Sequence, residues 1–140
     1  MSKNKLPNWD LSEIYLNYKD PKIEKDQKKI NNSVKTFVVK WKGKIKTLDG
    51  NEISNCLREY EKINEKLGLL STHSSLSFAG NMEDEEISRY NSKISDWISQ
   101  LFSKIVFVSL EIASVNDKVF NQWVKNKYSK RWIPLIKNLR

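Results

Sequence analysis

EDEEISRYNSKISDWISQLFSKIVFVSLEI, residues 83–112, is the stretch of sequence that decides the fold. Apolar side chains recur along it mostly at three- and four-residue steps, the period of an amphipathic helix. This stripe consists of Ile87, Tyr90, Ile94, Trp97, Ile98, Leu101, Phe102, Ile105 and Ile112. The acidic residues at positions 83–86 precede it, where negative charge stabilises a helix N-terminus. We expect one long helix, apolar on nearly all sides around residues 105–110, as a central helix would be.

Two more helices are expected before this segment. Asp20 and Pro21 form an N-cap and first-turn pair, so a helix should run from there to about Lys42, with Gly43 as its stop. Its apolar stripe is Ile23, Ile30, Val34, Phe37, Val38 and Trp41. A turn at residues 48–50 leads into a second helix with the stripe Ile53, Cys56, Leu57, Tyr60, Ile63, Leu67 and Leu70. Gly68 is a weak point in that helix, and residues 71–78 should pack closely or be partly loop.

The two ends of the chain carry weaker signals. Residues 6–10 are expected to form an extended arm, with Asp10 capping a helical turn after it. Asn116 should cap a fourth helix. Residues 132–139 should form a final helical piece that is interrupted at Pro134. No segment of useful length alternates with period two, so a sheet is not expected. The sequence predicts one all-α domain, residues 1–140, arranged as an antiparallel helical bundle or helical hairpin stack of about four main helices.

Composition limits the functional classes. The 140 residues carry 25 basic and 17 acidic side chains, a formal net charge of +8. Cys56 is the only cysteine, so no internal disulfide can form. No signal peptide is recognisable at residues 1–10, and the longest apolar stretch, residues 105–110, is far shorter than a membrane span. We therefore expect a cytoplasmic protein without a membrane partner.

The residues of several catalytic chemistries are absent. A zinc peptidase of the HExxH type needs two histidines one helical turn apart, and His73 is the only histidine. Cys56 and His73 are too few ligands for a closed structural zinc site, and their spacing does not support a nucleophile–base pair. The carboxylates at 83–86 occupy successive helix positions, which suits a solvated N-terminus better than paired acid–base work. We assign no catalytic, cofactor-binding or metal-binding residue to the chain.

The basic balance raises a second function class. Residues 35–46 and 118–140 contain no acidic side chain. Aromatic and basic residues alternate between Trp123 and Trp132, the composition of a groove that stacks nucleic-acid bases. The competing interpretation places both tryptophans in the core and the bases in solvent. No helix-turn-helix, RRM or KH pattern accompanies the stretch. A small basic helical module that binds nucleic acid or a protein partner is therefore the alternative function.

Four sequence pieces, in this order, resemble the N-terminal region of the oligoendopeptidase F family. They are WDLSEIY at 9–15, DPKIEKD at 20–26, WKGKI at 41–45, and YEKINEKLG at 60–68 followed by STHSSLSFA at 71–79. Each piece alone is weak, but order and spacing agree over roughly the first 80 residues. Trp41 stands where the family often has tyrosine, and His73 where an aromatic is usual. The segment after Gly80 lacks the threonines that are common there.

The resemblance implies a function for a larger protein. In that family the helical N-terminal domain packs over a zinc-dependent catalytic domain and helps to wall a closed channel for oligopeptides. The zinc ligands and the general base lie far downstream, so no catalytic residue carries over to this chain. The partner implied is the catalytic domain, and the oligopeptide is met only indirectly. Because the chain ends at Arg140 inside a predicted helical region, we expect a domain fragment or a truncated gene product.

Overall fold

The structure, a computed structural model, describes residues 17–140 and is all-α over that range. The expected arm at 6–10, the Asp10-capped turn and the motif at 9–15 lie outside the described residues. Within the described part no strand is present, as the sequence predicts. The α-helices are α1 (Pro21–Trp41), α2 (Gly50–Gly80), α3 (Glu85–Ile105), α4 (Phe107–Ser114), α5 (Asp117–Lys125) and α6 (Ile133–Leu139). Short 3₁₀ turns, η2 (Ile45–Thr47) and η3 (Lys130–Trp132), precede α2 and α6.

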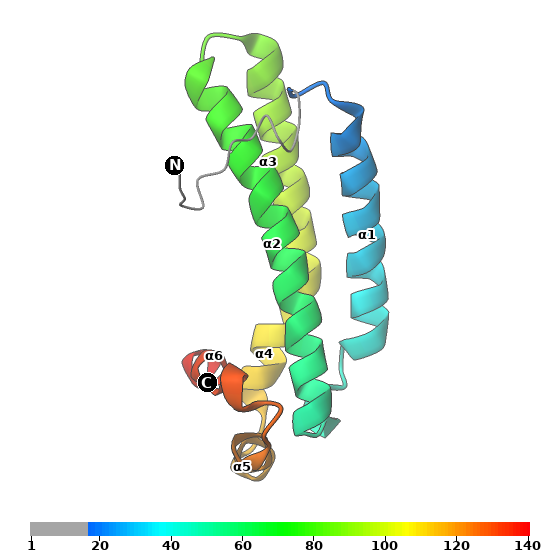
Figure 1. Ribbon diagram of the computed structural model, residues 1–140, viewed down its shortest axis with the longest axis vertical. Helices are drawn as coiled ribbons and strands as arrows, with labels where there is room; N and C mark the ends of the chain where they lie inside the picture. The colour runs from blue at the N-terminus through cyan, green and yellow to red at the C-terminus, as the bar shows by residue number, and fades with distance from the viewer. Residues whose placement is uncertain (1–16) are drawn as a thin grey trace, which may run out of the picture.

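The three long helices lie side by side and run in alternating directions (Figure 1). The shorter α4, α5 and α6 gather at the end of the bundle where α1 leads into α2. The fourth predicted helix exists as α5, but it is only nine residues long. The long part of the bundle therefore has three helices, and short helices close one end.

Local sequence sets the helix starts. Asp20 Oδ1 accepts a hydrogen bond from the backbone N–H of Lys22 at 3.0 Å, which caps α1 as expected. Gly43, just past α1, has a φ of +79°, a conformation that glycine adopts without steric cost. Asp49 and Glu52 form a capping box at the start of α2, with bonds of 2.8 and 3.1 Å. Asn116 caps α5 through the N–H of Val119 at 2.9 Å.

Most residues of the predicted stripes form one continuous core, but Phe102 of the third stripe is 45% exposed and lies outside it, as does Ile87. This core joins α1, α2 and α3 along the bundle and extends through α4 to the C-terminal helices. Near the lower end, Phe37 of α1 and Phe107 of α4 meet with ring centroids 5.6 Å apart. Burying each large apolar side chain contributes about 1.5–3 kcal/mol, so this core supplies the main driving force for folding. The largest fully buried members are Val34, Phe37, Ile45, Ile53, Leu57, Leu67, Leu70, Ile105, Val108, Ile112, Trp123 and Ile136.

The segment from 83 to 112 is not one uniform helix. α3 ends at Ile105 and α4 begins at Phe107, with Val106 between them. This places α4 against the α1–α2 connection, where the carboxylate of Glu111 accepts from the N–H groups of Gly43 and Ile45 at 2.7 and 3.2 Å. The expectation that residues 105–110 are covered on nearly all sides is wrong. Val106 is 45% exposed and Leu110 is 64% exposed, because no described element packs over them.

Of the two alternatives for residues 71–78, close packing or a partial loop, the loop does not occur, and the expected interruption at Pro134 does not occur either. α2 continues through Gly68 and through residues 71–78 without a loop. Bonds to α3 hold that polar segment, because Ser74 Oγ donates to Asn91 Oδ1 at 2.7 Å. Pro134 does not interrupt the last helix, because it lies in the first turn of α6, where a missing N–H costs no intrahelical bond.

Candidate functional site

An exposed apolar face runs along the end of α3 and into α4. Phe102, Val106 and Leu110 follow one another at four-residue steps, so they lie on the same side of this continuous stretch. Their side chains are 45%, 45% and 64% exposed. Contiguous exposed apolar residues of this kind mark interaction sites more often than scattered single ones do. We call these three residues the α3–α4 face.

A groove between α2 and α3 leads into this face. It has a volume of about 230 Å³, and Phe102 lies at one end of it. Small hydroxyl side chains form both walls, with Ser71 and Ser75 on α2 and Ser95 and Ser99 on α3. Small side chains let another element approach closely, so the groove and the α3–α4 face together form a surface suited to packing.

The stretch Glu85–Ser114, which comprises α3, Val106 and α4 and includes the face, also has the length and composition of a membrane span. Only 33% of its most apolar window is buried. The core helix of a soluble protein can pass the same test, so this is weak support for a membrane protein. A soluble protein is compatible with the structure.

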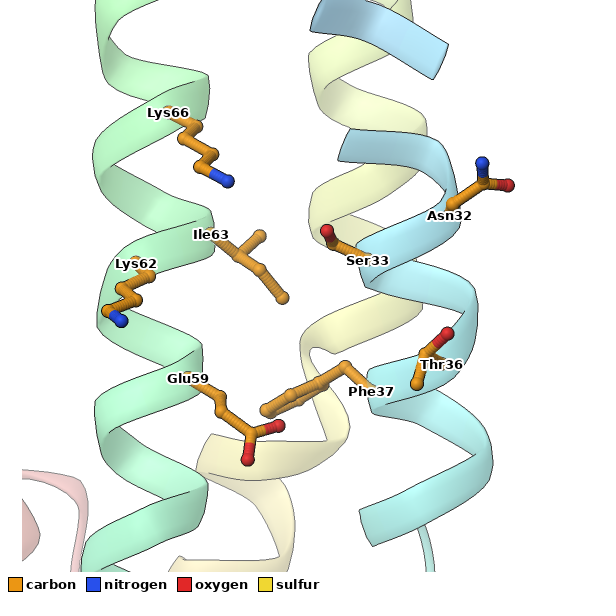
Figure 2. A pocket seen from close by; sticks show the side chains of 8 residues that line it. All are labelled: Asn32, Ser33, Thr36, Phe37, Glu59, Lys62, Ile63 and Lys66. Carbon is orange, nitrogen blue, oxygen red and sulfur yellow. The ribbon is translucent and has the colours of Figure 1, made fainter. Parts of the chain in front are cut away.

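A second groove, of about 360 Å³, lies between α1 and α2 (Figure 2). Phe37 and Ile63 form its floor, and Lys62 and Lys66 project from α2 beside it. Ser33 and Thr36 line the α1 side, together with Asn32, and Glu59 lies at the lower end. This set holds hydroxyls and amines but no histidine or thiol, so it offers no activated nucleophile.

His73 belongs to a buried polar pair rather than to a catalytic group. Its Nδ1 lies 2.8 Å from the hydroxyl of Tyr90, and the two rings meet edge to face. Burial lowers the pKa of His73, against an opposing effect of the Asp20 charge. Burial raises the pKa of Tyr90 to about 12. Both groups are therefore neutral near pH 7, and the pair joins α2 to α3 as a structural contact.

Cys56 and His73 do not come together. Both lie on α2, and their separation of 17 residues corresponds to about 25 Å along a helix. Burial raises the pKa of the Cys56 thiol to about 12, so it carries no thiolate near pH 7. Among residues 17–140, no group of three or more histidine, cysteine, aspartate or glutamate side chains is placed to hold a metal ion.

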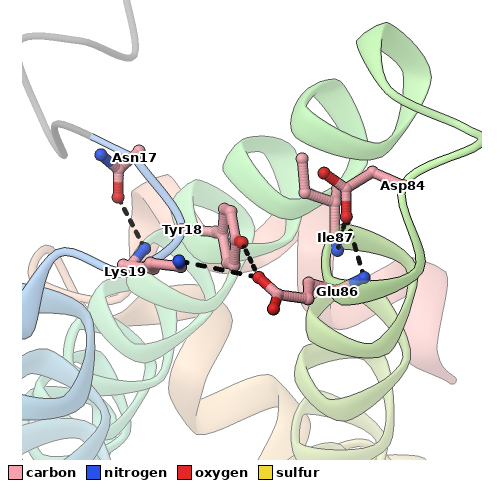
Figure 3. Close-up of polar contacts among 6 residues, drawn as sticks. All are labelled: Asn17, Tyr18, Lys19, Asp84, Glu86 and Ile87. Carbon is pink, nitrogen blue, oxygen red and sulfur yellow. Dashed lines mark hydrogen bonds and ion pairs between the residues drawn. The ribbon is translucent and has the colours of Figure 1, made fainter.

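The acidic cluster caps α3 and ties it to the segment before α1 (Figure 3). Asp84 accepts from the N–H groups of Glu86 and Ile87 at 2.9 and 3.2 Å. Glu86 accepts from the hydroxyl of Tyr18 at 2.5 Å and pairs with Lys19 at 3.6 Å. Asp84 thus caps α3, and Glu86 connects it to the segment before α1. Both roles agree with the prediction that these carboxylates belong to a helix N-terminus.

The tryptophans of the basic C-terminal stretch are core residues. Trp123 is fully buried, and its Nε1 donates to the carbonyl of Leu48 at 3.0 Å. Trp132 is 4% exposed and donates to Ser54 Oγ at 3.1 Å. Neither ring is available to stack on a base, so the core interpretation of both is confirmed. Tyr128 remains exposed in this stretch, with Lys127 over its ring.

The α3–α4 face was not predicted from the sequence. Its residues were recognised as apolar, but their exposure depends on which elements pack over them. The run at 105–110 was a usable signal, since a helix apolar on all sides needs either a core or a partner around it.

Fold and site together define an all-α domain with an uncovered apolar face and without a recognisable catalytic group in residues 17–140. No protein-family model, no curated protein and no solved structure matches the chain.

Proposed function

We propose that this chain is the N-terminal helical domain of a zinc-dependent oligopeptidase similar to oligoendopeptidase F. In the full-length enzyme it would pack against the catalytic domain and help to enclose the channel for oligopeptides. The proposal rests on the order of four sequence pieces within residues 9–79. The all-α fold is compatible with it, as is the long unbroken α2 across residues 60–79.

The structural observation that supports the proposal is the α3–α4 face. A channel-wall domain without its catalytic domain should leave an apolar surface uncovered, and Phe102, Val106 and Leu110 provide one. Burying an apolar surface removes it from water at about 25 cal/mol per Å², so docking of a second domain there is favourable. The serine-lined groove beside Phe102 would let an element of that domain approach closely.

Under this proposal the chemistry belongs to the catalytic domain. The zinc, its HExxH ligands and the general base would all come from that domain, and we derive no catalytic step for residues of this chain. What this chain contributes is a wall, which restricts access of large substrates and excludes bulk water. The protein would be cytoplasmic, with the catalytic domain as its partner and no membrane partner.

The activity of the native protein tests the proposal. An antibody against this chain is used to immunoprecipitate the native protein from the source cells. The precipitate should cleave a quenched-fluorescent oligopeptide, and a zinc chelator should abolish the cleavage while added zinc restores it. A precipitate that contains the chain but shows no chelator-sensitive cleavage above that of a control antibody would refute the assignment.

A further inference from the structure

A third groove lies between α1 and α3, on a different side of α3 from Phe102. It has a volume of about 410 Å³. Val38 lines it, together with Val39, whose side chain is 74% exposed. Lys35 of α1, Lys42 at the C-cap of α1 and Lys104 of α3 supply its charged lining. The groove therefore combines an apolar strip with three cationic side chains.

One end of this groove is fixed by a bond between the two helices. Trp97 Nε1 of α3 donates to Asn31 Oδ1 of α1 at 2.8 Å. Asn31 also lines the groove, next to the buried Val34. This contact holds α1 and α3 at a set separation, so the groove is a feature of the folded bundle.

The positive charge of the groove is uncompensated within residues 17–140. None of the ion pairs there involves Lys35, Lys42 or Lys104. By contrast Lys40, which also lies on α1, pairs with Glu59 at 2.8 Å. Residues 35–46 contain no acidic side chain, so the neighbouring sequence supplies no local counter-charge. A ligand that fits this surface must bring carboxylates or other anionic groups together with apolar ones.

The spacing of the lysines specifies the shape of the ligand. Lys35 lies in α1 and Lys42 is its C-cap residue, so their seven-residue separation corresponds to about 10.5 Å, roughly two helical turns, along the helix axis. Acidic residues seven apart on a facing helix would match them, and apolar residues between those acids would reach Val38 and Val39.

We propose that this α1–α3 groove binds an acidic amphipathic helix of a partner protein. No aromatic side chain lines the groove, so it lacks the stacking platform of a single-strand nucleic-acid site. The proposal does not depend on the peptidase assignment, because it rests on α1 and α3 alone.

Fluorescence anisotropy tests the proposal with a labelled peptide. The probe is about 20 residues long, a length that supports helix formation, with glutamates at i and i+7 and leucines at i+3 and i+4. We expect saturable binding that weakens as salt rises. Lys35→Glu with Lys42→Glu should weaken it about tenfold, since attraction becomes repulsion at two positions.

The matched control is Lys22→Glu with Lys29→Glu. These exposed lysines lie on the same helix, seven residues apart, and their replacement changes the net charge equally. The control should change the affinity by no more than about twofold, because rim charges away from the contact contribute little. Circular dichroism of both double variants checks that the bundle is intact.

A third variant tests the apolar strip. Val39→Asp should fold normally, because the Val39 side chain is 74% exposed. It should weaken binding of the peptide as strongly as the groove double variant does. Equal peptide affinity for the groove and control double variants would overturn the proposal, as would no saturable binding by the wild-type chain. Binding of a single-stranded oligonucleotide and of anionic vesicles is measured for the same variants. The proposal would also be overturned if the groove variants lost either of these more strongly than they lost the peptide, because the groove would then belong to another ligand.

Discussion

Gly50, the first residue of α2, lies directly against the turn that follows α5. A Cβ atom at this position would be 2.3 Å from both Cβ and Cγ of Asn126. Asn126 cannot easily move, because its Oδ1 accepts from the N–H of Tyr128 at 2.7 Å and so holds the turn. The glycine is needed here for the close approach of two segments far apart in the sequence.

Gly50→Ala should therefore destabilise the fold by about 1–3 kcal/mol, as overpacking does. The matched control is Gly68→Ala, in the interior of the same helix with nothing within 4 Å of an added Cβ. That change should stabilise the fold by about 0.5–1 kcal/mol, because alanine favours the helix. Urea unfolding followed by circular dichroism measures both. Shifts of the same sign in the two variants would contradict the contact with Asn126.

His73 should make the stability depend on pH. Burial lowers its pKa in the folded protein below the ordinary value of 6.5. At pH values between the two pKa values the unfolded chain binds the proton and the folded chain does not, so unfolding is favoured. The stabilisation is complete above 6.5 and is lost as the pH falls from 6.5 toward the folded pKa.

Replacing His73 with Gln removes this titration. Urea midpoints measured from about pH 7.5 down to about pH 5 should fall more steeply for the wild type than for His73→Gln. Parallel pH profiles for the two proteins would show that this imidazole is not held neutral by the fold.

At the scale of elements, α3 has one covered side and one bare side. Leu101 is 2% exposed and lies in the core, whereas its neighbour Phe102 is 45% exposed on the α3–α4 face. Leu101→Ala should cost about 2–5 kcal/mol, the usual cost of emptying a buried site. The same range is expected for Trp97→Ala, which loses packing and its bond to Asn31.

Phe102→Ala should cost about 1 kcal/mol or less, since the ring is partly in water already. Thermal or urea melts of the single variants measure these differences. Equal destabilisation by Leu101→Ala and Phe102→Ala would contradict the placement of Leu101 in the core and of Phe102 on the exposed side of α3.

Helix starts could be predicted because they depend on neighbouring residues alone. Asp20 with Pro21, and Asn116, each carry the capping chemistry in their own sequence. The continuation of α2 through residues 71–78 could not be predicted in this way. It is held by Ser74 and His73, whose partners on α3 are 17 positions further along the chain.

Exposure is the property that the sequence could not supply. The apolar stretch at 105–110 is compatible with a central helix and with a docking surface, and only the packing of α4 decides between them. The α1–α3 groove could not be predicted for the same reason. Lys104 lines the same groove as Lys35 and Lys42 only after α3 folds back beside α1. The lack of acidic residues at 35–46 was visible in the sequence. The exposure of the apolar strip between the lysines was not.

At the scale of the whole molecule, the α3–α4 face should dominate the apolar surface open to dyes. Phe102→Glu with Leu110→Glu is compared with Leu76→Glu with Met82→Glu, which changes two other exposed apolar side chains, 54% and 66% exposed. Fluorescence of an apolar dye should fall more in the face variant, because its residues are contiguous. An equal fall in both variants would argue against a distinct face.

The size of the native protein tests the central claim most directly. An immunoblot of the source cells, made with an antibody against this chain, measures it. The account predicts a band several-fold larger than the 16.5 kDa of this chain, as a domain of a complete peptidase requires. A single band at 16.5 kDa would contradict that account and would favour a stand-alone helical binding module.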